Sequence, residues 1–153
     1  MKYYEDLEVG TKASFGHYEV TREEVIEFAS KYDPQPFHLD DEAAAQTYFG
    51  RLSASGWHTC AMTMRMMVEH FSSQEAASLG SPGIDELRWI KPVYPGDTLR
   101  VESELIEKRQ SKSKPHMGFT KTRQTTFNQH GEPVMTMVGN GIIRVRDPEA
   151  PAG

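Results

Sequence analysis

The sequence predicts an α+β domain, in which short helices precede antiparallel strands that wrap around one central helix. Three observations lead to this prediction. The chain has 153 residues, a single-domain length that is large enough to bury one core. The stretch Gly56–Phe71 has apolar side chains on most of its helical circumference. Beyond about residue 84, β-forming segments alternate with turn sequences.

The first part of the chain is expected to hold one strand and two short helices. The strand lies around Ala13–Val20, and a helix follows over TREEVIEFASKYD, where Thr21 and Glu24 have the spacing of a capping box. Apolar side chains recur there at helical spacing: Val25, Phe28, Ala29 and Tyr32. A second helix has Asp40 as its N-cap and ends before Gly50.

The long helix Gly56–Phe71 is apolar on nearly all sides. One face carries Trp57, Cys60, Ala61, Met64, Met67, Val68 and Phe71. Met62 and Met66 add apolar surface on another side, so only a narrow strip around Arg65 and Glu69 is polar. Such a helix is expected to be enclosed by other structure.

The remainder of the chain is predicted to be a series of strands. IDELRWIKPV leads into a turn at residues 94–97, and TLRVESELI and GFTKTRQTTF follow as strands. NQHG forms a turn at residues 128–131 before a last strand in PVMTMVGNGIIRVR. One domain therefore spans residues 1–146, and residues 147–153 form a disordered tail.

Composition excludes several classes of protein. The chain is 37% apolar and 25% charged with a net charge of −5, and it has no basic stripe, which argues against a nucleic-acid partner. It has no apolar run of membrane-spanning length, and its N-terminal sequence is acidic, unlike a signal peptide. A single cysteine, Cys60, excludes an internal disulfide. We expect a cytoplasmic protein without membrane association. The histidines show no metal-ligand spacing, so no metal site is expected.

The loop YDPQPFHLDD places Asp33 and His38 close together in a stiff segment. Pro34 and Pro36 exclude a helix interior, and a spacing of five suits neither a helix face nor a strand face. In one interpretation Asp33 only caps a turn and His38 is exposed. In the other, the loop curls so that both side chains meet, as an acid–base pair that holds one water molecule.

The segment SASGW, residues 53–57, begins the long helix. Ser55 or Ser53 is its N-cap, and Gly56 allows another backbone or a ligand to come close. Gly56 then either permits tight packing or presents its N–H, at a helix N-terminus, to a developing negative charge.

These segments together resemble the MaoC-like (R)-specific enoyl-CoA hydratases. DPQPFH resembles the catalytic segment of that family, ASGWHT the start of its central helix, and IKPVYPGDTL the following strand, turn and strand. The resemblance implies a hotdog fold, with the antiparallel sheet wrapped around Gly56–Phe71. It also implies action on thioesters of coenzyme A, in fatty acid metabolism, with no cofactor beyond the coenzyme A of the substrate.

The resemblance also implies roles for individual residues. Asp33 and His38 match the catalytic pair, and the Gly56 amide matches the donor to the thioester oxygen. The expected substrate-binding residues are Gln35, Pro36, Phe37, Ser55 and Trp57. Departures from the family pattern lie beside the expected pocket: Gln35 replaces an Asn, Phe37 an aliphatic residue, Tyr32 a small residue and Ser55 a His.

The expected reaction is the reversible addition of water to a trans-2-enoyl-CoA, giving an (R)-3-hydroxyacyl-CoA. Two alternatives remain at this point, a hotdog acyl-CoA thioesterase and a non-catalytic acyl-CoA binding domain. A thioesterase would want a carboxylate near the start of the central helix, whereas this helix offers only Glu69, toward its end. The resemblance further implies a homodimer or a dimer of dimers. Candidates for binding the phosphates of coenzyme A are Arg88, Lys91, Lys112 and Lys114.

Overall fold

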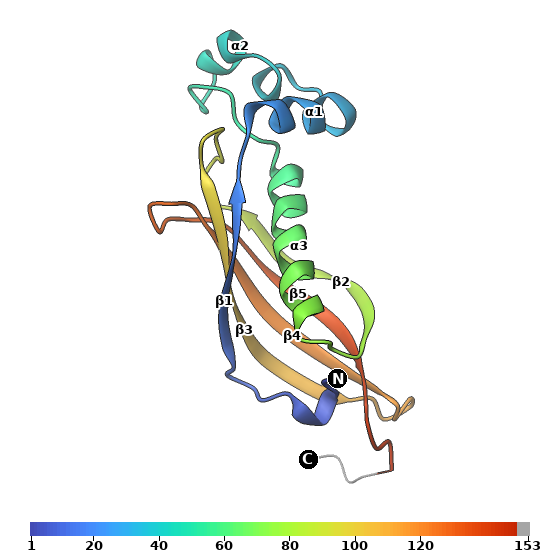
Figure 1. Cartoon of the computed structure of the whole chain (residues 1–153). Coiled ribbons are helices and arrows are strands. Elements are labelled where there is room, and N and C mark those ends of the chain that lie inside the picture. Colours follow the sequence, from blue (N-terminus) through green and yellow to red (C-terminus); the bar gives the residue numbers. More distant parts are fainter. Residues whose placement is uncertain (150–153) are drawn as a thin grey trace.

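The computed structural model describes residues 1–149 of the chain. The elements, in order, are η1 (Tyr4–Asp6), β1 (Lys12–Glu19), α1 (Arg22–Tyr32), η2 (Pro36–His38), α2 (Asp41–Ala45), α3 (Gly56–Ser73), β2 (Ser78–Trp89), β3 (Thr98–Gln110), β4 (Met117–Phe127) and β5 (Pro133–Arg144). All five strands join one antiparallel sheet in the order β1-β3-β4-β5-β2. The sheet curves around α3, while α1 and α2 lie together beyond the end where α3 begins (Figure 1). The predicted α+β class is confirmed.

Side-chain caps fix the start of each α-helix. Thr21 accepts a hydrogen bond from the N–H of Glu24 at 3.2 Å, and Asp40 accepts one from the N–H of Ala43 at 3.0 Å. Ser55 caps α3 by accepting from the N–H of Trp57 at 3.3 Å. The Glu24 carboxylate does not complete the expected capping box, because it turns instead toward β1 and α3.

The core lies between α3 and the inner face of the sheet. Met62 and Met66 on α3 are almost fully buried against Leu99 and Val101 of β3 and the valine and methionines of β5. A buried hydrogen bond of 2.8 Å joins the hydroxyls of Thr63 and Thr126, which ties the middle of α3 to β4. The helix is therefore fixed to the sheet by both apolar and polar contacts.

Residues 1–149 enclose only part of the circumference of α3. The side of α3 that carries Met62, Thr63 and Met66 faces the sheet, so much of the predicted apolar face points away from it. The exposed residues of that face are Trp57, Ala61, Met64, Val68 and Phe71, which follow one another at intervals of three and four. One sheet can cover only one side of a helix, and no other element within residues 1–149 covers this one. On α1, Tyr32 is also exposed, by 71%, because the helix ends there.

The start of β2 differs from expectation. Strand β2 begins at Ser78, earlier than predicted, and its register against β5 shifts repeatedly between Ser78 and Arg88. Residues 150–153 of the predicted tail lie outside the described residues, while the Asp147 N–H donates to Glu5 at 2.9 Å.

Within residues 1–149, no helix combines the length and the apolar character needed to cross a membrane.

Candidate functional site

The loop between α1 and α2 brings Asp33 and His38 together. Asp33 is the C-cap of α1, where its N–H still bonds to Ala29, and a turn of 3-10 helix over Pro36–His38 then reverses the chain. The Asp33 Oδ2 and the His38 Nε2 come to lie 3.6 Å apart. The two side chains are 17% and 6% exposed, respectively. The stiff loop therefore aims an acid and an imidazole at one point, and it is more than a connecting turn.

A backbone carbonyl sets which nitrogen of His38 carries the proton. The Nδ1 lies 2.7 Å from the carbonyl oxygen of Ser53, which can only accept a hydrogen bond. Nδ1 must therefore carry a hydrogen, and in the neutral ring the Nε2 that faces Asp33 is a free acceptor. The rings of Phe37 and Phe49, with centroids 4.6 Å and 5.7 Å from that of His38, pack around the imidazole.

Asp33 accepts a hydrogen bond on each of its carboxylate oxygens. The Ser55 hydroxyl donates to Oδ2 at 2.7 Å, and the Gln35 amide donates to Oδ1 at 2.5 Å. Partial burial raises the pKa of Asp33, but the bonds from Ser55 and Gln35 and the nearby imidazole outweigh it, so the pKa is lower than that of an ordinary aspartate. Asp33 is consequently ionised at neutral pH.

The segment that leads into α3 contributes to the same site. It is anchored by a 2.8 Å hydrogen bond from the Ala54 N–H to the Val93 carbonyl. Gly56 is the first residue of α3, so its N–H has no partner within the helix and remains available to a ligand. The Trp89 indole donates to the Gly56 carbonyl at 2.9 Å, and a Cβ on Gly56 would lie 2.5 Å from the indole ring. The glycine is required by this close contact.

These groups open into one hollow of about 460 Å³. It is lined by Asp33, Gln35, His38, Tyr48, Phe49, Ala54, Gly56, Trp57, Thr59, Trp89, Ile90, Lys91, Pro92 and Val93. Of the expected substrate-binding residues, Gln35 and Trp57 line the hollow. Pro36, Phe37 and Ser55 do not line it, and Ser55 is fully buried against Asp33.

Sequence reasoning named Lys91 in the wall of the hollow, as a candidate for binding coenzyme A, but it missed the aromatic residues beside it. Trp89 is 33 residues from Gly56, and its ring is placed over the start of the helix only because β2 runs back along the sheet. Tyr48 and Phe49 follow α2 in a connecting segment whose position no periodicity specifies. The one local signal was Trp89 itself, a large aromatic residue just before the Lys91–Pro92 turn.

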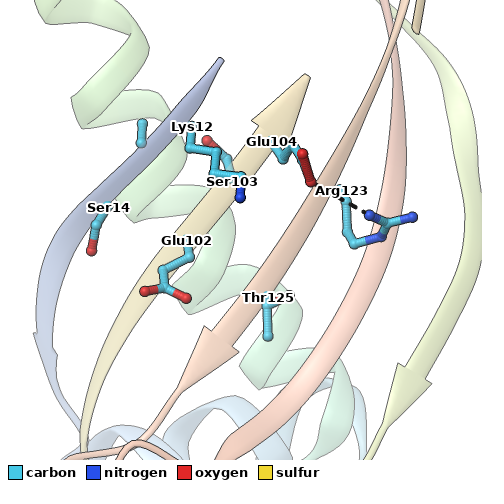
Figure 2. A pocket seen from close by; sticks show the side chains of 8 residues that line it. Lys12, Ser14, Glu102, Ser103, Glu104, Arg123 and Thr125 are labelled. Atoms are coloured by element: carbon cyan, nitrogen blue, oxygen red, sulfur yellow. Dashed lines mark ion pairs between the residues drawn. The ribbon is translucent and has the colours of Figure 1, made fainter. Parts of the chain in front are cut away.

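A second hollow, of about 540 Å³, lies on the opposite face of the sheet. Figure 2 shows its side chains on β1, β3 and β4 on the side of the strands away from α3. The hollow is lined by paired or solvated polar groups, and Arg123 lies 3.7 Å from Glu104. It includes neither Asp33 nor His38. A shallow polar surface of this kind is typical of a solvated sheet face.

Metal and thiol chemistry receive no support from the described residues. Within residues 1–149, no three His, Cys, Asp or Glu side chains are grouped so that they could hold a metal ion. Cys60 is half-buried beside Met135, and burial raises the pKa of its thiol, which favours an inert core cysteine.

Comparison with known proteins identifies the family. Residues 6–126 match the model of the MaoC like domain. The MaoC-like dehydratase of Rhodospirillum rubrum superposes with a TM-score of 0.87 at 39% identity, over 96% of this chain and 99% of that one. The (R)-hydratase from A. caviae superposes with a TM-score of 0.66 at 26% identity, over 91% and 97% of the two chains.

One curated relative is more similar over a shorter stretch. Mesaconyl-CoA hydratase from Cereibacter sphaeroides is 44% identical over 70 residues, which are 46% of this chain and 20% of that protein. The present chain thus spans only a fifth of that relative. The family match covers most of the chain, and it includes the Asp33–His38 loop, the start of α3 and the strand that follows Val93. With its five-stranded hotdog sheet around α3, the chain belongs to the MaoC-like dehydratase domain family.

Proposed function

We propose that the protein catalyses the reversible addition of water to a trans-2-enoyl-CoA, giving an (R)-3-hydroxyacyl-CoA. The observation that carries the proposal is that two hydrogen-bond acceptors, on Asp33 and His38, face each other in the hollow that also contains the N-terminus of α3. Asp33 Oδ2 and His38 Nε2 face each other at 3.6 Å, and both accept hydrogen bonds. A water molecule has two O–H groups to donate, so it is the natural occupant between them.

The substrate binds with its thioester carbonyl at the start of α3. The Gly56 N–H donates to the carbonyl oxygen and stabilises the enolate-like charge that develops when water adds. The helix dipole at this N-terminus acts in the same direction. Asp33 and His38 hold the water against Cβ, one of its protons passes to the pair, and Cα receives a proton from the pair. Dehydration of the 3-hydroxyacyl thioester follows the same path in reverse.

Thioester hydrolysis has weaker support. Glu69 is exposed near the C-terminal end of α3, where it forms an ion pair with Arg65. Glu24 does approach the first turn of α3, but its carboxylate is occupied by Tyr18 and His58 and lines a different hollow. No carboxylate on α3 itself lies in the hollow that contains Gly56.

Incubation with crotonyl-CoA tests the proposal. We expect loss of the enoyl absorbance without release of the free thiol, and formation of 3-hydroxybutyryl-CoA whose configuration a chiral assay identifies as (R). Asp33→Asn and His38→Ala should each lower kcat by roughly 10²–10⁴-fold, because the first removes the carboxylate charge and the second removes the imidazole, both of which act on the water.

Other outcomes would contradict the proposal. Release of coenzyme A would identify a thioesterase. Binding without turnover, across enoyl-CoAs of several chain lengths, would identify an acyl-CoA binding domain. Wild-type activity in Asp33→Asn would exclude the proposed acid–base pair even if the protein is a hydratase.

A further inference from the structure

Two residues that depart from the family pattern act on the same side chain. Gln35, in the place of an Asn, donates to Oδ1 of Asp33, and Ser55, in the place of a His, donates to Oδ2. Both oxygens of the carboxylate are therefore already hydrogen-bonded before a water or a substrate binds. A carboxylate that accepts such bonds is stabilised in its charged form and is a weaker base.

The opposite holds for the imidazole. Its Nδ1–H is committed to the Ser53 carbonyl, so the lone pair of Nε2 is left to face the hollow and Asp33. A backbone carbonyl on Nδ1–H holds the ring in this tautomer, in which the other nitrogen is the acceptor. Of the two acceptors, the His38 Nε2 is thus the one that is free to take a proton.

We propose that Ser55 and Gln35 are positioning residues that divide the work of the pair, so that His38 Nε2 accepts the proton of water while Asp33 stays ionised. This inference rests on the proposed hydratase function. The water oxygen forms its bond to Cβ as one O–H proton moves to Nε2. The π electrons shift to the thioester enolate, and Nε2 then returns the proton to Cα. Asp33 Oδ2 orients the water and stabilises the imidazolium, without exchanging a proton itself.

Ser55 has a second role that links the two halves of the site. Its hydroxyl donates to Asp33 and accepts from the Trp57 N–H, which makes it both the support of the carboxylate and the N-cap of α3. Gly56, the oxyanion donor, is the next residue. Ser53 supports His38 through its carbonyl, and Ala54 between them is anchored to Val93. One short extended segment therefore positions the acid, the imidazole and the oxyanion donor together.

Few other charged groups act on the pair. Within residues 1–149, the other charged residue that lines the hollow is Lys91, and it is paired with Glu132. Lys31, near the end of α1, is paired with Glu27 at 3.3 Å. The environment of Asp33 is accordingly set by Ser55, Gln35 and His38.

The first test is the pH dependence of kcat/KM with crotonyl-CoA. An imidazole base becomes protonated at a higher pH than a carboxylate base, so it loses activity earlier as the pH falls. We expect the acid limb of an imidazole in the wild type. Asp33→Asn should keep this acid limb at a lower kcat, and His38→Gln should remove the limb together with most of the activity. An acid limb in the carboxylate range would overturn the proposal.

The second test does not depend on turnover. NMR titration of the substrate-free protein follows the side-chain carbon of Asp33 and the ring nitrogens of His38. We expect a protonated Nδ1 on His38, and a pKa of Asp33 that rises in Ser55→Ala and in Gln35→Leu. An Asp33 pKa that stays unchanged in both variants, or a His38 ring with Nδ1 unprotonated, would overturn the proposal even in an active enzyme.

A matched control separates positioning from simple loss of a helix cap. Thr21→Ala removes a hydroxyl N-cap from the far end of α1, where it does not contact Asp33. It should leave the pH profile and the Asp33 titration unchanged, while Ser55→Ala and Gln35→Leu lower kcat by roughly 10- to 100-fold. If the wild type turns over no enoyl thioester, the proposed function fails, and the NMR titration still decides the roles of Ser55 and Gln35.

Discussion

Single atoms decide what the candidate site can do. The Ser53 carbonyl leaves His38 Nε2 as an acceptor, and the donors on Asp33 keep its carboxylate charged. The sequence indicated that Asp33 and His38 belong together, because two prolines restrict the backbone of the short loop between them and so favour one fixed shape. It could not indicate that Ser55 reaches Asp33, since the two are 22 residues apart and meet only in the folded chain.

Gly56 can be tested at the level of its single N–H. Proline removes that donor, and it is suited to the first position of a helix after Ser55, whose φ of −56° and ψ of 141° are extended. However, a Cβ at residue 56 would lie 2.5 Å from the Trp89 indole, so proline alone would displace that ring. The test therefore needs a background in which Trp89 is replaced by alanine.

We compare Gly56→Pro with Gly56→Ala, both combined with Trp89→Ala. Both double variants carry a Cβ, and only the proline lacks the N–H. We expect the proline variant to have a kcat lower by roughly 10²–10³-fold, the usual effect of losing one oxyanion donor. Circular dichroism must first show that both variants are folded. Equal kcat values would mean that the carbonyl is polarised elsewhere and that Gly56 serves only the contact with Trp89.

At the scale of elements, a buried histidine joins α1, α3 and β1, outside the hollow that contains Asp33 and His38. The His58 Nε2 lies 3.2 Å from Glu24, which also accepts from the Tyr18 hydroxyl, and the Phe28 ring stacks on the imidazole. The His58 Nδ1 is buried and has no hydrogen-bond partner among the described residues. Periodicity predicted the helices themselves, but not this cluster, because its members come from three elements.

This cluster makes the stability of the fold depend on pH. Burial lowers the pKa of His58 below that of an ordinary histidine, although Glu24 opposes the change. Below the ordinary histidine pKa the unfolded chain therefore binds more protons than the folded chain, so stability falls as the pH falls through that range. His70 contributes in the same direction, because burial also lowers its pKa.

We expect a melting temperature that decreases between about pH 7.5 and about pH 5.5, and a smaller decrease in His58→Gln. The readout is the change between the two pH values, since the variant also loses buried contacts and melts lower overall. His17→Gln is the matched control, because His17 lies on β1 with a side chain 72% exposed. A decrease in His58→Gln as large as that of the wild type would show that His58 is not the group responsible.

At the scale of the whole molecule, both α3 and the edge strand of the sheet leave apolar side chains exposed. Trp57, Met64, Val68 and Phe71 are 39% to 58% exposed on α3. On and beside β2, the edge strand, Leu79, Ile84, Trp89 and Ile90 are 43% to 48% exposed. The sequence predicted that α3 is enclosed by other structure, but it could not tell whether that structure belongs to the same chain. Large exposed apolar surfaces of this kind mark interfaces.

We propose that a second copy of the chain covers this surface, in a homodimer or a dimer of dimers. Strand β2 pairs with β5 on one edge, and its other edge is free within residues 1–149. The β2 strands of two copies can therefore pair and extend the sheet, which brings the exposed apolar faces of the two α3 helices toward each other. Trp57 and Trp89 belong both to this surface and to the hollow that contains Asp33, so the proposed acyl site would lie at the boundary between subunits.

Light scattering at micromolar concentration measures the assembly directly, and we expect at least twice the mass of one chain. Val68→Glu should shift the protein toward monomer, because a charge in the middle of the apolar stripe would be buried without a partner. Glu69→Gln, the neighbouring substitution, changes an exposed ion pair with Arg65 and should leave the mass unchanged. The monomeric Val68→Glu variant should also lose hydratase activity, although Val68 does not line the hollow. A wild type that is monomeric and fully active would contradict both the dimer and the shared site.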